Sequence, residues 1–392
     1  MMRNRWGVLA ILFFIRGTMA VQFQSVATVA PLLSADLGAS LADIGILVGL
    51  YSVPGVVLAL PGGAIGQRFG DKKTVLLGLV LMIVGSFIMA FSSSWGGQIS
   101  ARLVAGIGGV LMSVLMTKMV ADWFTGKEIS TAMAIFVNSW PVGIAISLLS
   151  LPPIGVVYGA SGAYLAVAAL IAVGVGLLAG LYNSPVVSTG TGGSRGRLSL
   201  HAALAVFCAG LIWGLYNMGF AMSFSFGPSM LVERGWSMTA AGSAISIVLW
   251  LSALSVPIGG FLADRTGRHD TIMVSCFFVF AMLLVLASRT EAIITALIAL
   301  GMLCGLAAGP ILSLPPRVLE PETRAIGMGV FFSISYVGLV LGPVLGGKYA
   351  TWAGNAGAAL DFGAAVLLIC PVILGMFQRV QSGVKIRVQS SS

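Results

Sequence analysis

An arginine inside a long apolar segment is the residue whose placement most needs a chemical explanation. Arg16 follows Arg5 by eleven residues in the first apolar segment, which in a helix is roughly 16 Å along the axis. A guanidinium at the centre of a membrane-spanning helix costs about 2.5 to 3.5 kcal/mol on insertion scales. We therefore expect Arg16 to face a wet cavity or a partner instead of lipid.

No carboxylate is placed by the sequence to neutralise Arg16. All acidic residues fall in predicted loops or near predicted helix ends: Asp36, Asp43, Asp71, Asp122, Glu128, Glu233, Asp264, Asp270, Glu291, Glu320, Glu322 and Asp361. An anionic ligand, such as a carboxylate or another small planar anion, would supply the missing charge through a bidentate contact. The alternative is a structural Arg16 held by backbone carbonyls or water.

Two other basic residues lie in apolar segments. Arg102 stands near the start of one, where it would either help to draw an anion inward or support the helix bundle; the sequence favours neither role. Lys118 precedes Asp122 by four residues, so it can pair along the helix and reach the polar boundary.

Aromatic and amide side chains complete a candidate cavity. Trp213, Tyr216, Asn217 and Phe220 follow the spacing i, i+3, i+4, i+7 and so share one helix face. Such a stripe either packs a core or lines a site, and a Tyr or Asn facing lipid would be costly. The candidate substrate-binding residues are Arg16, Gln24, Arg102, Asn138, Trp140, Trp213, Tyr216, Asn217 and Tyr336.

The elements that position these residues are membrane-spanning helices. Of the 392 residues, 58% are hydrophobic and only 8% are charged, with a mean hydropathy of +1.03, against about 25% charged in an ordinary soluble domain. At roughly 20 residues per span, twelve spans and short connections fit the length. The predicted spans are 7–33, 41–66, 74–92, 97–121, 130–153, 160–183, 202–229, 237–262, 271–288, 291–313, 324–347 and 356–378.

The basic residues outside the spans predict the orientation. If the amino terminus lies in the cytoplasm, fifteen Lys and Arg residues fall on the cytoplasmic side. Only three basic residues fall on the opposite side, namely Arg234, Arg289 and Lys348. This bias predicts an even number of spans, both termini in the cytoplasm and an inner-membrane location. The basic residues are scattered between apolar segments and form no polar face, which argues against nucleic-acid binding.

Two halves of the chain repeat one another. Gly63-Ala-Ile-Gly-Gln-Arg-Phe-Gly-Asp-Lys recurs 197 residues later as Gly260-Phe-Leu-Ala-Asp-Arg-Thr-Gly-Arg-His. This repeat predicts two pseudo-symmetric six-helix bundles, at 1–183 and 202–392, joined by a polar linker at 184–201. The fold class is therefore an all-α membrane protein with twelve transmembrane helices.

These motifs resemble the signature of the major facilitator superfamily, Gly-x-Leu-x-Asp-Arg-x-Gly-Arg/Lys, and the similarity of architecture covers the whole chain. The second copy matches at every position, whereas Gln67 replaces the acid in the first copy, which implies a weaker or rebuilt latch there. Glycines allow a tight turn, and a carboxylate and a guanidinium can pair in one conformation only; the alternative is a solvated loop. The predicted conformational switch comprises Gly63, Arg68, Gly70, Gly260, Asp264, Arg265, Gly267 and Arg268.

The segments Phe14-Ile-Arg-Gly-Thr and Val26-Ala-Thr-Val-Ala-Pro-Leu-Leu are similar to the first span of the anion:cation symporter and cyanate-permease branches. That resemblance implies that Arg16 takes the substrate-binding role of the basic residue at this place. The membrane carboxylates that such symporters use for proton coupling have no counterpart here, so uniport, exchange and symport of a protonated substrate stay open.

A small-anion transporter working by alternating access, facilitative or secondary active, is the function that these features favour. The alternative is a proton-coupled exporter of lipophilic or cationic compounds, which would normally need a negative site residue. The predicted spans hold no nucleophile, metal cluster or carboxylate pair, so the sequence predicts no enzyme and no cofactor. The expected partners are an anionic substrate, the bilayer and a coupling proton or counter-substrate, and the expected state is a monomer.

Overall fold

The computed structural model describes residues 4–124, 129–182, 198–319 and 323–390, and these residues form helices and no strand. Eleven of the described helical stretches are long and apolar enough to cross a membrane, and one of them covers Ile135–Leu181. That stretch bends at Gly159, whose φ of 70° is easily adopted only by glycine. It therefore supplies two spans, and the predicted twelve-span, all-α membrane fold is confirmed.

The first half of the chain follows the predicted spans with local breaks. Its helices are α1 (Arg5–Thr28), α2 (Ala30–Leu37), α3 (Leu41–Leu50), α4 (Val53–Phe69), α5 (Asp71–Phe91), α6 (Trp95–Phe124) and α7 (Ile129–Leu181). The predicted span 7–33 is interrupted at Val29, and the predicted span 41–66 at Tyr51 and Ser52. Each break is followed by a proline in the first turn of the next helix, a position that tolerates the missing N–H.

The remaining elements form the second half of the chain. Its elements are α8 (Leu200–Glu233), α9 (Met238–Thr266), α10 (His269–Ala287), α11 (Ile293–Cys304), η1 (Gly305–Ala307), α12 (Ala308–Leu312), η2 (Pro315–Arg317), α13 (Arg324–Ala353), α14 (Gly357–Leu367) and α15 (Cys370–Ser390). Helix α8 begins at Leu200, two residues before the predicted boundary of the second bundle. Its start is capped by Ser199, whose side chain accepts from the backbone N–H of Ala202.

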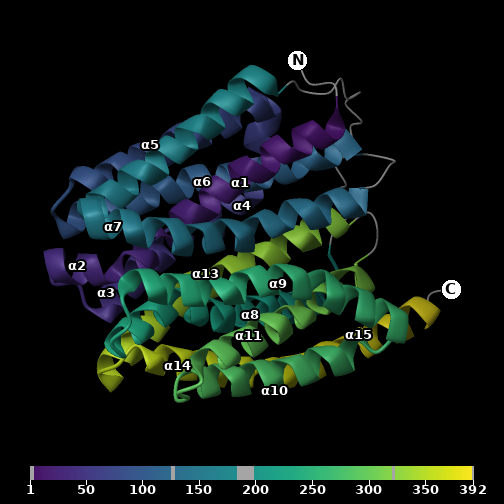
Figure 1. Cartoon of the computed structure of the whole chain (residues 1–392). Helices are drawn as coiled ribbons and strands as arrows, with labels where there is room; N and C mark the ends of the chain where they lie inside the picture. Colours follow the sequence, from purple (N-terminus) through teal and green to yellow (C-terminus); the bar gives the residue numbers. More distant parts are fainter. Residues whose placement is uncertain (1–3, 125–128, 183–197, 320–322, 391–392) are drawn as a thin grey trace.

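The two halves lie one above the other in Figure 1, with the first half from purple through blue to teal and the second from green to yellow. Helix α1 begins and α15 ends at the same end of the molecule, which we call the termini end; α2 and α3 lie at the far end (Figure 1). Large apolar side chains remain exposed along the helices, among them Phe91, Trp352 and Val372. In a membrane protein these residues face lipid.

The halves meet mainly where α3 and α4 pack on α13 and where α7 packs on α9. Small residues make the first contact possible, because a Cβ at Gly45 would lie 2.1 Å from the backbone oxygen of Pro343 and one at Gly347 would lie 2.4 Å from that of Leu41. The segment of α13 that contains Pro343 and Gly347 is thus a packing surface between the halves, because its small residues let the helices approach closely.

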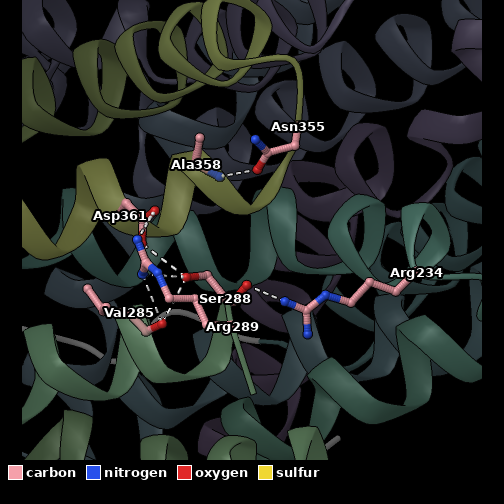
Figure 2. Close-up of polar contacts among 7 residues, drawn as sticks. All are labelled: Arg234, Val285, Ser288, Arg289, Asn355, Ala358 and Asp361. Carbon is pink, nitrogen blue, oxygen red and sulfur yellow. Dashed lines mark hydrogen bonds and ion pairs between the residues drawn. The ribbon is translucent and has the colours of Figure 1, made fainter. Parts of the chain in front are cut away.

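A polar network ties three helix ends together at the far end of the second half (Figure 2). Arg289 contacts both carboxylate oxygens of Asp361 at 2.8 and 3.0 Å, and the Ser288 hydroxyl donates to the same carboxylate at 3.0 Å. Arg234 donates to the backbone oxygens of Ser288 and Thr290. These basic residues are therefore occupied with joining α8, α10 and α14.

Candidate functional site

Arg16 lies within α1, and its guanidinium is only partly satisfied. Nη1 donates to the backbone oxygen of Phe136 in α7 at 3.1 Å, and the guanidinium carbon lies 4.7 Å from the centre of the Phe136 ring. Nε is buried and has no hydrogen-bond partner among the described residues. Within the described part of the chain, no carboxylate lies within 4.0 Å of Arg16. The guanidinium thus keeps donor capacity for a ligand.

Tyr336 reaches the same region from the other half of the protein. Its ring packs on Gly55 in α4, where a Cβ would lie 2.5 Å from Cδ1 of the tyrosine. Its hydroxyl interacts with the Ser113 side chain of α6, and the residue lies within electrostatic range of Arg16. The structure therefore brings together Arg16 and Tyr336, which the sequence placed in opposite halves.

Arg102, in contrast, is fully buried and well satisfied. Its Nε donates to the backbone oxygen of Leu47 at 2.8 Å, and Nη1 and Nη2 donate to those of Gln22 and Phe23 at 3.0 Å each. The guanidinium also lies 4.8 Å from the centre of the Tyr51 ring. Of the two roles that the sequence left open, this geometry supports the structural one, because Arg102 fastens α6 to α1 and α3.

The Gln22 side chain continues this structural network. Its amide nitrogen donates to the backbone oxygen of Met82 at 2.6 Å and to the Ser86 hydroxyl at 2.8 Å, and its amide oxygen lies 3.3 Å from the Tyr51 hydroxyl. Sequence analysis missed Tyr51, because nothing in the local pattern distinguishes a tyrosine between two helix segments from an ordinary packing residue.

The amide side chains of two candidate residues join the halves. The Gln24 amide donates to the backbone oxygen of Phe224 in α8 at 2.7 Å, and the Asn138 amide donates to that of Ala253 in α9 at 3.1 Å. Gln24 is fully buried, and its amide oxygen has no partner among the described residues. In this conformation both amides fasten one half of the protein to the other.

The aromatic candidates pack against neighbouring side chains. Trp140 lies 5.1 Å, between ring centres, from Phe23. Trp213 stacks on Tyr216 at 5.5 Å, and the Tyr216 hydroxyl donates to the backbone oxygen of Cys304 at 2.8 Å. Among the described residues, no contact joins Trp213 or Tyr216 of α8 to Arg16.

Asn217 belongs to the same stripe and is also occupied. Its amide donates to the backbone oxygen of Trp213, one turn earlier, at 2.7 Å. The predicted shared face of α8 is present, but it packs within the second half.

The second signature motif lies at the termini end of α9, and its charged side chains are exposed. The Asp264 side chain is 82% exposed and lies 3.8 Å from Nε2 of His269. Arg265 lies over the Phe261 ring, and Arg268 is exposed. Gly267 has a φ of 66° and ends the helix, while a Cβ on Gly309 would lie 2.9 Å from the Cα of Gly260. The pairing of Asp264 across the bundles stays a prediction.

The first motif forms a different contact. Gly70, with a φ of 87°, ends α4, and Arg68 is exposed over the Phe69 ring; the surroundings of Gly63 and the side chain of Gln67 lie outside the described residues. Asp71 accepts a charged hydrogen bond from Lys118 of α6, which also lies 3.6 Å from Asp122. The pairing of Lys118 with Asp122 was expected from their spacing, whereas Asp71 was missed because it comes from another helix.

The family model for the Major Facilitator Superfamily matches residues 12–226 and 202–387. The chain belongs to this superfamily. It is 24% identical over 325 residues to the probable nitrate transporter NarT of Staphylococcus haemolyticus, covering 78% of this chain and 83% of the relative. It is 24% identical over 377 residues to the hexuronate transporter of Bacillus subtilis, covering 88% of each.

A solved structure confirms the fold. A POT family transporter in complex with a thioalcohol-conjugated peptide superposes with a TM-score of 0.74 at 16% identity, covering 95% of this chain and 96% of that one. The chain is thus a multi-pass transporter of the facilitator fold, and the prediction that it is not an enzyme is confirmed by its family.

Proposed function

We propose that this transporter moves a small anion through a central site in which Arg16 is the main anion-binding residue. The observation that carries the proposal is the buried Nε of Arg16, a hydrogen-bond donor that has no partner in the described part of the chain. Among the described residues, no carboxylate pairs with this guanidinium. A buried donor left unpaired costs about 1 to 3 kcal/mol, which a bound anion would recover. The names of the two relatives, a nitrate and a hexuronate transporter, support the same class of cargo.

Tyr336 gives this site a contact from the second half. A ligand held between Arg16 and Tyr336 would touch both bundles, so its binding would be sensitive to their relative position, as alternating access requires. The alternative, an exporter of cationic compounds, lacks support at this site. Arg16 would repel a cation, and no carboxylate among the described residues lies beside it to bind one. We further propose an inner-membrane location with both termini in the cytoplasm.

The test is anion uptake into proteoliposomes, with nitrate and glucuronate as probes. Arg16→Ala should lower uptake about ten- to a hundredfold, the loss expected for a charge-assisted hydrogen bond. Arg16→Lys should recover little, because a point charge lacks the planar fork. The matched control is Arg379→Ala, an exposed arginine of α15. Uptake of both anions at the unmodified rate in Arg16→Ala would refute the assignment.

A further inference from the structure

A second polar pocket lies at the far end of the first half, away from Arg16. It has a volume of about 250 Å³ and is bordered by α2, the end of α5, the start of α6 and the part of α7 that follows Gly159. Its polar lining includes Asp36, Ser92, Gln98, Ser161 and Tyr164. The pocket is much larger than the roughly 30 Å³ that one water occupies.

Two buried polar atoms of the lining have no partner among the described residues. Gln98 is 2% exposed, and its amide nitrogen donates to the backbone oxygens of Met89 and Ser92 at 3.0 and 2.8 Å. These bonds fix the amide orientation and leave the Gln98 Oε1 unpaired. Tyr164 is 1% exposed, and its hydroxyl is also unpaired. Both atoms can accept a hydrogen bond.

The charge of the lining is negative. Asp36 is exposed at the rim, and the structure describes no ion pair for it. Ser161 donates its hydroxyl proton to the backbone oxygen of Ala90 at 2.7 Å, so its oxygen can only accept from a ligand. Arg102 acts electrostatically on Tyr164, but its guanidinium is turned to three backbone carbonyls and does not line the pocket. The lining thus suits a cation that carries several N–H donors.

The rim of the pocket is continuous with the lipid-facing surface. Phe91, which lines the pocket, is 75% exposed. It stacks on Phe87, one turn earlier on α5, with the ring planes 5° apart and the centres 6.3 Å apart, and Phe87 is also exposed. Phe91 is the last residue of α5, and the ends of a membrane-spanning helix lie near the depth of the lipid headgroups. A polar pocket beside this helix end is within reach of a headgroup.

We propose that this pocket binds the primary ammonium of a lipid ethanolamine headgroup. Asp36 pairs with the ammonium charge, and the Gln98 Oε1 and the Tyr164 hydroxyl oxygen accept its hydrogen bonds. The acyl chains lie along Phe87 and Phe91. Such a lipid braces α2, the continuation of α1, against α6 and α7.

The test measures lipid retention and needs no transported anion, so its result is independent of the proposed role of Arg16. The purified protein is reconstituted in mixed nanodiscs that contain phosphatidylethanolamine, its mono- and dimethyl derivatives and phosphatidylcholine, then released into mild detergent for native mass spectrometry. Retention should fall with each added methyl group, because phosphatidylcholine has no N–H donor. Asp36→Asn should weaken ethanolamine-lipid retention about tenfold, and Tyr164→Phe should weaken it less.

Glu291→Gln is the matched control, since Glu291 is also an exposed acid at the far end but lies in the other half; it should retain lipid as the unmodified protein does. Equal retention of ethanolamine and choline lipids would overturn the proposal, as would unchanged retention in Asp36→Asn. A thermal-shift titration with free ethanolamine separates the two sources of the ammonium. Stabilisation by free ethanolamine that depends on Asp36, without selective lipid retention, would refute the lipid as the ligand.

Discussion

Gln24 in the first half donates a hydrogen bond of 2.7 Å to the backbone oxygen of Phe224 in the second half, within a fully buried contact. The Asn138 amide makes an equivalent bond to the Ala253 backbone oxygen. A membrane transporter that alternates between two openings must break such bonds and remake them in each cycle. The hydrogen bonds of both amides therefore contribute to the free-energy difference between the conformations of the transporter.

Gln24→Leu should shift the protein toward conformations in which α1 and α8 are separated. Leucine keeps the side-chain volume but cannot donate, and one hydrogen bond contributes about 0.5 to 1.5 kcal/mol, a change of up to about tenfold in the conformational equilibrium. Double electron–electron resonance between spin labels at Ser93 and Asn355, exposed at the far end of each half, should show a larger long-distance population. Asn138→Leu is the second variant, because it removes the equivalent bond to the Ala253 backbone oxygen and should shift the population in the same direction. Identical distance distributions in all three proteins would contradict this role.

Arg102→Ala should destabilise the protein far more than Arg16→Ala. Removing Arg102 takes a donor from three backbone oxygens inside the bundle, those of Leu47, Gln22 and Phe23. The Gln22 oxygen keeps the Ser25 hydroxyl as a donor, and each buried group left unsatisfied costs about 1 to 3 kcal/mol. Removing Arg16 leaves the Phe136 oxygen with the Ser139 hydroxyl as a donor, and it also removes an unpaired donor. The Tm of each variant in detergent measures the two losses of stability. A smaller loss of Tm in Arg102→Ala than in Arg16→Ala would show that the structural role is misassigned.

Asp264→Asn should slow turnover with little change in substrate affinity. Asp264 is 82% exposed in this conformation, so its replacement costs little here, and the carboxylate would matter only in a conformation in which it pairs across the bundles. Uptake kinetics in proteoliposomes should therefore show a lower maximal rate at similar KM. Glu291→Gln serves as the control, and a maximal rate equal to that of the unmodified protein would remove Asp264 from the switch.

The sequence predicted the spans because hydropathy and loop charge are local properties of the chain. It placed Arg16 inside the bundle for the same reason, since a guanidinium in an apolar segment must find a polar environment. The sequence could not divide the roles between Arg16 and Arg102, because that division depends on which backbone carbonyls the neighbouring helices place at each guanidinium: Phe136 of α7 at Arg16, and Leu47 of α3 at Arg102. The placement of these carbonyls depends on how the helices pack, which no local pattern of the sequence specifies.

The aromatic face of α8 also shows that a local sequence pattern does not determine which helix a residue contacts. Its spacing correctly placed Trp213, Tyr216 and Asn217 on one face, but spacing alone does not say whether that face meets the other half or its own. The Tyr216 hydroxyl donates to the buried Cys304 carbonyl, at the point where α11 ends and η1 begins. Asp71 likewise joined Lys118 from a separate helix, a contact that no pattern within one segment can reveal.

Gly55→Ala should disturb the candidate site through Tyr336 without touching Arg16. The new Cβ would lie 2.5 to 2.8 Å from three ring carbons of Tyr336, so the ring must move away from Ser113 or the halves must separate. If Tyr336 contacts the substrate, Gly55→Ala should raise KM for anion uptake severalfold. Tyr336→Ala should lower affinity by a comparable factor, and adding Gly55→Ala to it should cost nothing further, because the ring that the methyl group displaces is already gone. The four uptake curves form a double-mutant cycle, in which strictly additive effects would mean that the two positions act independently and that Tyr336 is not the residue through which Gly55 affects binding.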